Sequence, residues 1–493
     1  MPKRNMAADP VETELKLEFD PADRNKLEAI APLVSAEGKT DRLVSTYFDT
    51  ADRDLARAGY SLRVRRTGRR RIQTIKSAGA ASAGLFARTV CERSLHGDQP
   101  QIDEASGALI EAVSADALSR IEPVFVTDVR RAIFRIDAGG AAIEFAIDEG
   151  EIRAGERAEP LCEIELELRG GTPQALFDLA RALNEQVPLR LGVRSKAERG
   201  YALLEDAAAD AWKAESIALD RDGGAGEAFG TIAQACIRQF RLNEALLLQS
   251  VSAEALHQAR VGLRRLRSAF SLFKPLYVDD PRAALLRAEL HWLAAELGDV
   301  RNIDVLVARF EGDARKLLAD ARDRAFGHVR AGLVGTRSRL LLIDLAEWLT
   351  VGAWRTELAH PDRQHRRVTV FASDVLDVRR DRLERRGEGL SGLDREHRHK
   401  VRIEAKKLRY ASEFFASLYI GDKARRRHER FLEALEALQE QLGELNDLVV
   451  GPQVLAKLGI DAKLPKSGKH RRERILAHAE EAYRALLRAK RFW

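Results

Sequence analysis

Alternating charges mark a short stretch near the start of the chain. In ETELKLEF, residues 12–19, the charged Glu12, Glu14, Lys16 and Glu18 alternate with apolar or small residues. Alternation with period two is typical of a β-strand that has one apolar and one charged face. Carboxylates on such a face can hold divalent cations, and amines can bind phosphoryl oxygens. A single strand of this kind also fits an ordinary solvated surface.

Other predicted strands repeat the charged face. Their charged positions are Arg63 and Arg65 in SLRVRR, Glu144 and Asp148 in AIEFAID, and Glu163, Glu165 and Glu167 in CEIELEL. Merely solvated faces would mix Ser, Thr, Gln and Lys with these residues. We therefore expect the strands to close into an antiparallel β-barrel, with a wet interior in which acids and bases balance.

An interior of this composition favours one kind of chemistry. Clustered Arg and Lys residues bind phosphoryl oxygens, while grouped carboxylates hold Mg²⁺ or Mn²⁺, which in turn bridges phosphates. Only a polyanion together with a metal ion satisfies both sets. Phosphoryl transfer to water then needs positioning, charge neutralisation and an oriented water molecule.

The spacing of these residues resembles a known family. Glu12-x-Glu14-x-Lys16 resembles the ExExK signature of the CYTH superfamily, the triphosphate tunnel metalloenzymes, and the resemblance spans roughly residues 10–206. Companion motifs follow in the family's order. They are SLRVRR, TIK with Lys76, GLFAR with Arg88, TDVRR with Arg131, IEFAIDEGEI, CEIELEL and SKAERGY with Lys196.

The resemblance implies roles for individual residues. The residues that would grip phosphate are Arg63, Arg65, Lys76, Arg88, Arg131 and Lys196. Those that would hold metal or orient the water are Glu12, Glu14, Asp148, Glu163 and Glu165, and the catalytic set would be Lys16, Glu14 and Glu165. One position departs from the family: Val90 stands where similar proteins often carry an acid, with Glu92 two residues later. The role of that corner stays open.

The superfamily includes adenylate cyclases, thiamine triphosphatases and inorganic triphosphatases, so the substrate needs a separate argument. The predicted interior residues include no aromatic platform for an organic ring, which favours inorganic triphosphate. The layout is also similar to that of the family's bacterial inorganic triphosphatases. The alternatives are an enzyme acting on thiamine triphosphate or ATP, and a non-catalytic polyphosphate-binding or scaffolding protein. The many carboxylates favour an enzyme, because they would weaken a simple anion receptor.

The whole chain of 493 residues predicts two domains of different class. Residues 5–206 have the pattern of an α+β domain, residues 207–229 that of a linker, and residues 230–491 that of an all-α domain of Arg- and Leu-rich helices. The three cysteines are too scattered for a disulfide framework or zinc site. With no apolar leader or spanning segment, we expect a cytoplasmic protein without membrane contact, one that can associate with polyphosphate granules.

The second half contains an internal repeat. Residues 257–277 align without a gap to residues 399–419, which predicts two tandem helical bundles. Basic residues at offsets 0, 3, 7 and 10 fall within an arc of roughly 80° on a helix. The first stripe is His257, Arg260, Arg264 and Arg267, and the second is His399, Arg402, Lys406 and Arg409. A lone stripe of this type would be read as a solvated basic face.

The repeat pattern H-x-x-R-[VI]-x-x-[RK]-[RK]-L-R resembles the CHAD domain over about residues 225–491. That resemblance implies binding of inorganic polyphosphate, and two facing stripes would form a basic channel for it. Nucleic acid is disfavoured as a partner, because apart from Tyr410 and Phe270 the stripes offer few aromatic rings on which bases could stack. The isolated His291, His328 and His360 receive no predicted role.

Overall fold

The chain forms two compact units. In the computed structural model one unit comprises Met1–Ala209 with Thr336–Val351, here called the barrel unit, and the other comprises Asp210–Gly335 with Gly352–Trp493, here called the helical unit. The predicted combination of an antiparallel barrel and an all-α region is confirmed. The structure describes residues 11–30, 38–77, 84–103, 106–205, 210–355, 361–462 and 469–493.

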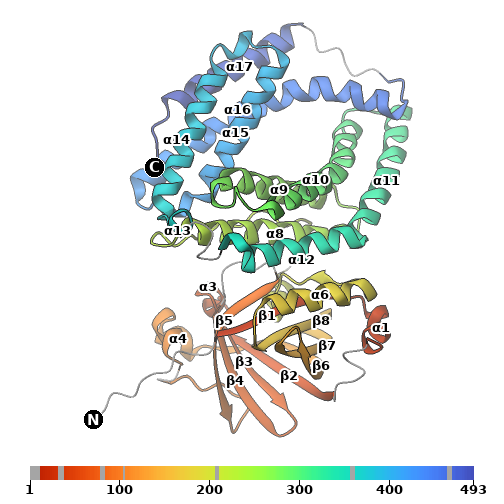
Figure 1. Ribbon diagram of the computed structural model, residues 1–493, viewed down its shortest axis with the longest axis vertical. Helices are drawn as coiled ribbons and strands as arrows, with labels where there is room; N and C mark the ends of the chain where they lie inside the picture. Colours follow the sequence, from red (N-terminus) through yellow and green to blue (C-terminus); the bar gives the residue numbers. More distant parts are fainter. Residues whose placement is uncertain are drawn as a thin grey trace. The chain divides into compact units, whose positions relative to one another are not determined.

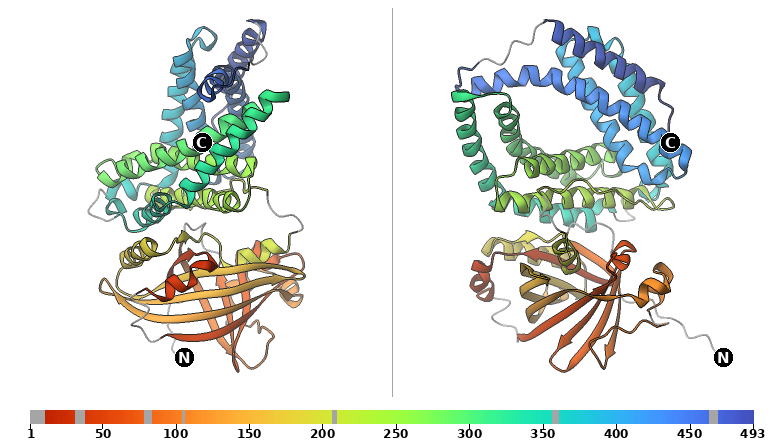
Figure 2. Two further views of the ribbon diagram at one scale, coloured as in Figure 1. Left: turned by 90° about the vertical axis from the view of Figure 1, so that its right-hand side faces the viewer. Right: turned by 180° about the vertical axis from the view of Figure 1, so that it is seen from behind.

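Antiparallel strands make up most of the barrel unit (Figures 1 and 2). They are β1 (Val11–Glu18), β2 (Lys39–Asp49), β3 (Tyr60–Thr67), β4 (Arg70–Ser77), β5 (Leu85–Leu95), β6 (Glu122–Ala138), β7 (Ala141–Ala154), β8 (Arg157–Gly170) and β9 (Arg190–Leu191). The sheet order is β5-β4-β3-β2-β6-β7-β8-β1-β9, and an additional pairing of β5 with β1 joins its two sides. Within the described residues, eight strands therefore close into a ring.

Strand register places the charged residues on the inner face of this ring. Lys16 of β1 lies opposite Glu165 of β8, and Asp148 of β7 lies opposite both Glu163 of β8 and Arg131 of β6. Opposite residues of paired strands point to the same face. The period-two pattern of each strand thus converges on one shared interior.

The outer face of the ring is apolar where helices cover it. The short helices of the barrel unit are η1 (Pro21–Asp23), α1 (Arg24–Glu28), α3 (Asp54–Arg57), α4 (Gly107–Ala112) and α5 (Ala115–Ser119), and the longer ones are α6 (Gln174–Gln186), α7 (Lys196–Leu203) and α12 (Thr336–Val351). Phe48, Leu62 and Ile75 form a buried cluster with Leu55 of α3 and Leu109 of α4. Burial on this side leaves the polar face to the interior.

Helix α7 packs against the inner face of β6, β7 and β8. The Tyr201 ring of α7 meets the Phe125 ring edge-on, with centroids 5.1 Å apart, and Phe125 stacks on Tyr47 at 4.5 Å. A Cβ atom on Gly200 would collide with the Phe125 ring, so only glycine fits there. This apolar packing fixes α7 beside the charged residues.

Helix α12 comes from the middle of the second half of the sequence but belongs to the barrel unit. It packs against α6 and β9. Arg181 of α6 bonds Asp344 of α12 at 2.8 Å, and Arg339 of α12 donates to Asn184 of α6 at the same distance. The barrel unit is therefore assembled from two separate stretches of sequence.

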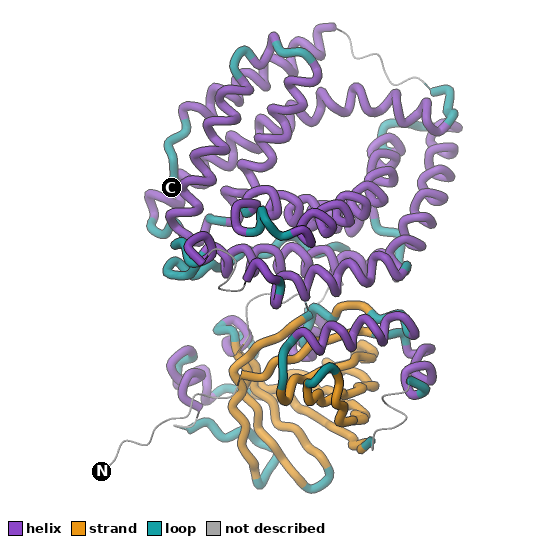
Figure 3. The backbone as a smooth tube through the Cα atoms, in the orientation of Figure 1, coloured by secondary structure: helices purple, strands orange, loops and turns teal. Residues whose placement is uncertain are grey.

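The described residues of the helical unit form helices and their connections, with one isolated β-bridge between Gly224 and Arg367 (Figure 3). They are α8 (Ala225–Gln249), α9 (Ala253–Leu272), η3 (Lys274–Leu276), α10 (Pro281–Val307), α11 (Gly312–Val334), η4 (Ala353–Arg355), α13 (Pro361–Gln364), α14 (Val368–Gly387), η5 (Leu390–Gly392), α15 (Arg395–Phe414), η6 (Ala416–Leu418), α16 (Asp422–Leu458) and α17 (Lys469–Arg488). None of the described helices is long and apolar enough to cross a bilayer.

The repeated segments lie on equivalent helices, α9 and α15. Each begins at a capped N-terminus, because Ser252 accepts from the Ala255 amide and Asp394 accepts from the His397 amide. Helix α9 packs against α8, α10 and α15. The central position of α9 brings the two repeats into direct contact.

The segment before α8 packs on the helical unit. The Trp212 amide donates to the Asn243 side chain at 2.9 Å, and the Leu219 amide donates to the Ser417 hydroxyl at 3.0 Å. Ile217 and Leu219 are buried. Residues 210–224 are thereby attached to the bundle despite their irregular backbone.

Candidate functional site

Three bases and three acids meet inside the barrel. They are Lys16 of β1, Arg131 of β6 and Lys196 of α7, with Asp148 of β7 and Glu163 and Glu165 of β8. All six side chains are at most 13% exposed. Formal charges of +3 and −3 cancel, which makes burial of so many ionised groups tolerable.

The acids are shared between bases rather than paired singly. Lys196 Nζ lies 2.7 Å from Asp148 Oδ2 and 2.9 Å from Glu165 Oε1, and it also contacts Glu163. Arg131 holds Asp148 with Nε at 2.7 Å and Nη2 at 2.5 Å, and it also contacts Glu165. Glu165 is the common partner, because it contacts Lys16 as well.

The network keeps its members ionised. Burial lowers the pKa of Lys16, but Glu14, Glu165 and Glu163 outweigh burial and raise that pKa above its usual range. Burial likewise opposes ionisation of Glu165, whose pKa Arg131, Lys16 and Lys196 hold well below its ordinary value. At neutral pH Lys16 and Glu165 are thus fixed charges.

The same carboxylates have the donor chemistry for a hard divalent cation. One oxygen from each of Asp148, Glu163 and Glu165 lies within 4.8 Å of the others. Oxygen ligands in this number suit Mg²⁺ or Mn²⁺. Glu14, 3.5 Å from Lys16 Nζ, adjoins the group, whereas Glu12 pairs with Lys76 at 2.9 Å. The five predicted metal-site residues therefore separate into a compact group of three, Glu14 in contact with Lys16, and Glu12 paired with Lys76.

Strand β3 supplies two arginines with little neutralisation. The Nε atoms of Arg63 and Arg65 are buried without hydrogen-bond partners among the described residues. Burial, Arg63 and Arg131 lower the pKa of Arg65 to about 9. Arg63 reaches the Tyr47 hydroxyl at 3.4 Å. An incoming anion would therefore find two buried Nε donors without hydrogen-bond partners, although Glu165 acts electrostatically on Arg65.

Val90 and Glu92, whose role the sequence left open, lie on β5. Val90 and Glu92 lie opposite Lys76 and Thr74 of β4, and Thr74 donates to Glu92 at 2.8 Å. Val90 is buried. The acid of this strand thus engages a hydroxyl rather than joining the three-carboxylate group. The Arg88 side chain lies outside the described residues.

A second group of carboxylates lies farther along β7 and β8. Arg169 contacts Glu144 at 3.1 Å and Glu167 at 2.7 Å. Burial, opposed by Arg169 and reinforced by Glu12 and Glu144, raises the pKa of Glu167 to about 7. Acid is in excess here, in contrast to the balanced cluster.

Two features of the interior were missed by sequence reasoning. Tyr47 faces the interior beside Arg63, and α7 rather than a strand delivers Lys196. Tyr47 had a signal, because it lies two residues before Asp49 on an alternating strand. Burial raises the pKa of Tyr47, but Arg63, Lys196 and Arg65 outweigh it and lower that pKa below its ordinary value.

In the helical unit, four residues of the two stripes form one basic surface. Arg260 and Arg264 of α9 interact electrostatically with Lys406 of α15, and Arg264 also with Arg402. Nε atoms of the three arginines are buried without hydrogen-bond partners among the described residues. Burial together with Arg402, Arg264 and Arg260 lowers the pKa of Lys406 to about 7.

The ends of the stripes differ from their middle. His399 is exposed, and Arg409 is neutralised by Glu413 at 2.8 Å and Glu436 at 3.2 Å. His257 is half-buried, and burial with Arg301 and Arg264 lowers its pKa. Arg267 contacts His291 Nδ1 at 2.8 Å, which gives that histidine a partner that the sequence did not predict.

The structure thus combines an antiparallel barrel that has an acid–base interior with a helical unit that has a basic surface. Residues 11–201 match the family model of the CYTH domain, and residues 231–456 match that of the CHAD domain. The family models thus find a CYTH domain in the first part of the chain and a CHAD domain in the second, as the motifs predicted.

Individual proteins are similar to one part of the chain or the other. An inorganic triphosphatase of Haemophilus influenzae is 32% identical over 193 residues, which cover 39% of this chain and 54% of that protein. The chain thus spans about half the length of this relative. The crystal structure of a CHAD domain from Ricinus communis is 30% identical, covers 57% of this chain and 97% of its own, and gives a TM-score of 0.48. A candidate adenylyl cyclase from Hippeastrum, described by a dominant triphosphatase activity, is 21% identical over 39% of this chain and 95% of its own, with a TM-score of 0.28.

Proposed function

We propose that the barrel unit hydrolyses inorganic triphosphate to pyrophosphate and phosphate with a divalent metal ion, and that the helical unit binds inorganic polyphosphate. The observation that carries the first part is the balanced cluster of Lys16, Arg131 and Lys196 with Asp148, Glu163 and Glu165. The triphosphatase relative, whose match is confined to the first part of this chain, supports the same reaction.

Charge balance argues for a polyanion and a metal ion together. An anion alone would leave three buried carboxylates without their bases, and a cation alone would leave three buried bases without their acids. When both enter, Lys16, Arg131 and Lys196 turn to phosphoryl oxygens and the carboxylates turn to the metal. The metal would supply charge neutralisation at the phosphates.

The chain's own residues then divide the work. Arg63 and Arg65, with buried Nε atoms lacking partners, bind the part of the substrate that does not react. Lys16, which remains protonated, stabilises charge on the phosphoryl group that is transferred. Glu165, the shared partner of the three bases, orients Lys16 and the attacking water.

An inorganic substrate is favoured over an organic one. Tyr47 is the aromatic residue beside the phosphate-binding arginines, but its ring is 3% exposed and stacks on Phe125. A covered ring offers no face to a base or a thiazole. Near these arginines, the described part of the interior therefore supplies charge contacts, and the Tyr47 ring gives an organic group no platform.

For the helical unit, the supporting observation is the group of Arg260, Arg264, Arg402 and Lys406, whose mutual repulsion no acid fully relieves. A linear polyanion would relieve it. Binding of this kind would also let the protein associate with polyphosphate granules in the cytoplasm.

The experiment is phosphate release from inorganic triphosphate, ATP, thiamine triphosphate and long-chain polyphosphate, each with Mg²⁺, Mn²⁺ or EDTA. We expect rapid turnover of triphosphate with metal, little turnover of ATP, and none in EDTA. Efficient turnover without a metal ion would contradict the charge-balance argument. Polyphosphate binding without any hydrolysis would instead favour the scaffolding alternative.

A further inference from the structure

Three helices of the helical unit enclose a groove of about 710 Å³. Each helix contributes residues at helical spacing, so one face of each lines the groove. The lining comes from α9 with Arg264, Arg267, Ser268, Phe270 and Ser271, from α10 with Ala284, Arg287, Ala288, Leu290 and His291, and from α15 with Ile403, Lys406, Lys407 and Tyr410. We name it the basic groove.

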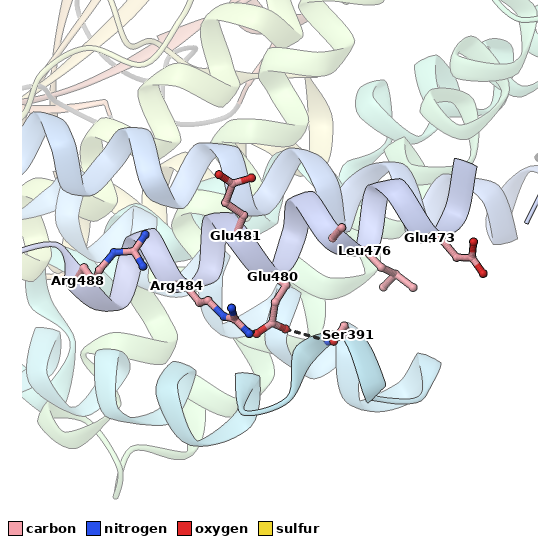
Figure 4. A pocket seen from close by; sticks show the side chains of 8 residues that line it. Ser391, Glu473, Leu476, Glu480, Glu481, Arg484 and Arg488 are labelled. Atoms are coloured by element: carbon pink, nitrogen blue, oxygen red, sulfur yellow. Dashed lines mark hydrogen bonds and ion pairs between the residues drawn. The ribbon is translucent and has the colours of Figure 1, made fainter. Parts of the chain in front are cut away.

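The charge of the basic groove has one sign. Among its described lining residues, five carry Lys or Arg side chains and none carries a carboxylate. A groove of similar size, about 740 Å³, lies along α17 and contains Glu473, Glu480 and Glu481 beside Arg484 and Arg488 (Figure 4). Mixed charge is thus found in one groove of this unit, and its absence from the basic groove indicates an anionic ligand.

Two arginines of α9 in the basic groove are available to an anionic ligand. Arg264 Nε is buried without a hydrogen-bond partner among the described residues. Arg267 Nη2 lies 2.8 Å from His291 Nδ1 on the facing helix, and none of the described lining residues offers this guanidinium a carboxylate. Both features favour phosphate oxygens between α9 and α10.

The lining of the basic groove also includes apolar side chains, which lie beside Arg287 on the same face of α10. Ala284 and Ala288, one turn apart on α10, are exposed, and their short side chains leave room above the helix. On α15, Ile403 is 37% exposed, and Tyr410 lines the same groove two helical turns further along. Inorganic polyphosphate has no use for apolar side chains, because all of its surface is charged or polar.

We propose that the basic groove binds a nucleoside diphosphate or triphosphate, with its phosphates on Arg264, Arg267, Arg287 and Lys407 and its base between the two alanines of α10 and Ile403. The volume suits a ligand of this size, since small-molecule sites occupy roughly 300–1000 Å³. The serine hydroxyls of α9 lie on the groove floor, where they can bond a ribose or base edge.

This inference does not rest on the proposed hydrolysis. The nucleotide is a ligand of the helical unit and not a substrate of the barrel, so loss of triphosphate turnover would leave the inference intact. Conversely, failure of nucleotide binding would leave the barrel reaction unaffected. The two proposals therefore fail separately.

The test is photolabelling of the full chain with 8-azidoadenosine diphosphate in EDTA, followed by peptide mapping. We expect labelled peptides from α10 or α15, and competition by ADP at concentrations at least about tenfold lower than by pyrophosphate, because only ADP contacts the apolar side chains. Label confined to barrel strands, equal competition by pyrophosphate, or no label would each overturn the proposal.

Matched variants localise the site. Ala288→Trp fills the space beside the apolar side chains of the groove without changing charge, and we expect it to reduce labelling at least tenfold while leaving triphosphate turnover unchanged. Ala331→Trp makes the same change at an exposed position of α11 and is expected to label as wild type does. If Ala288→Trp does not fold, Ala284→Gln tests the same face of α10 one turn earlier. Full labelling of a folded groove variant would exclude the groove as the nucleotide site.

Discussion

The barrel interior and the basic surface of the helical unit both gather Arg and Lys residues, but they treat the charge differently. In the barrel, Lys16, Arg131 and Lys196 each contact at least two carboxylates, and burial does not lower their pKa because the acids outweigh it. On the helical unit, burial and like charge lower the pKa of Lys406 to about 7 and of Arg260 to about 10.

This difference predicts what each region binds. A neutralised cluster exchanges partners, so it needs a cation and an anion at once. An under-neutralised surface is relieved by an anion alone. The number of carboxylates beside the bases, rather than the number of bases, therefore separates a metal-assisted hydrolytic site from an anion-binding surface.

The largest expected effect comes from breaking the neutralised cluster. Glu165→Gln removes the charge that Lys16, Arg131 and Lys196 share, and we expect triphosphate turnover to fall by roughly 100- to 1000-fold. Steady-state phosphate release measures it. Glu151→Gln, on the outer face of β7, is the matched control and should retain turnover. Polyphosphate binding should be unchanged in both, and equal turnover in both variants would place catalysis elsewhere.

A second test places acidic side chains on the under-neutralised basic surface of the helical unit. Arg260→Glu with Arg264→Glu should weaken binding of long-chain polyphosphate by roughly 30- to 100-fold, because two attractive contacts become repulsive. Titration calorimetry on the full chain at two salt concentrations measures affinity and its ionic part. Arg315→Glu with Arg324→Glu makes the same charge change at exposed positions of α11 and should have little effect. Similar losses in both pairs would mean that net charge alone decides binding.

The next largest effect is expected in the pH dependence of polyphosphate binding by the helical unit. Lys406, with a pKa of about 7, faces Arg260 and Arg264 from α9, Arg402 from its own helix and Asp447 from α16. A bound polyanion favours the charged amine, so binding takes up a proton above pH 7. Affinity should then fall by up to about tenfold from pH 6 to pH 8. Lys406→Arg keeps its charge over this range and should flatten the profile; an equally steep profile would assign the titration to another group.

The smallest expected effect concerns positioning of α7. The Tyr201 hydroxyl donates to the buried Asp49 at 2.8 Å, and Tyr201→Phe should lower the free energy of unfolding of the barrel unit by about 1–2 kcal/mol. Triphosphate turnover should fall by no more than about threefold, since Lys196 keeps its ion pairs. Tyr483→Phe removes a tyrosine hydroxyl bond to the backbone carbonyl of Glu384 in the helical unit and serves as control. Thermal unfolding and turnover, measured together, check both variants.

Much of the barrel was predictable because its strands obey a strict period of two. Once Lys16 and Glu165 are assigned to charged faces, closure of the sheet brings them together. Tyr47 was not predicted, since a single tyrosine on a strand is as common outside as inside. The contribution of α7 was also hidden, because nothing in SKAERGY indicates that its helix enters the barrel.

The helical unit was less predictable in detail. The helical period placed Arg260, Arg264, Arg402 and Lys406 on two faces, but which neighbours complete those faces depends on tertiary packing. Arg287 and His291 enter the groove only because α10 packs beside α9. By contrast, neutralisation of Arg409 by Glu413 could have been predicted from their spacing of four residues.

Because the barrel unit consists of two separate stretches of sequence, its last helix, α12, is synthesised long after the rest. Leu345, Trp348 and Leu349 of α12 are buried, and α12 bonds α6 through Arg181 and Arg339. A ribosome releases α6 more than 150 residues before α12 is complete. At synthesis rates of about 5–20 residues per second, the α6 surface waits on the order of ten seconds or more for its cover. During that interval Arg181 and Asn184 of α6 lack the partners that α12 later supplies.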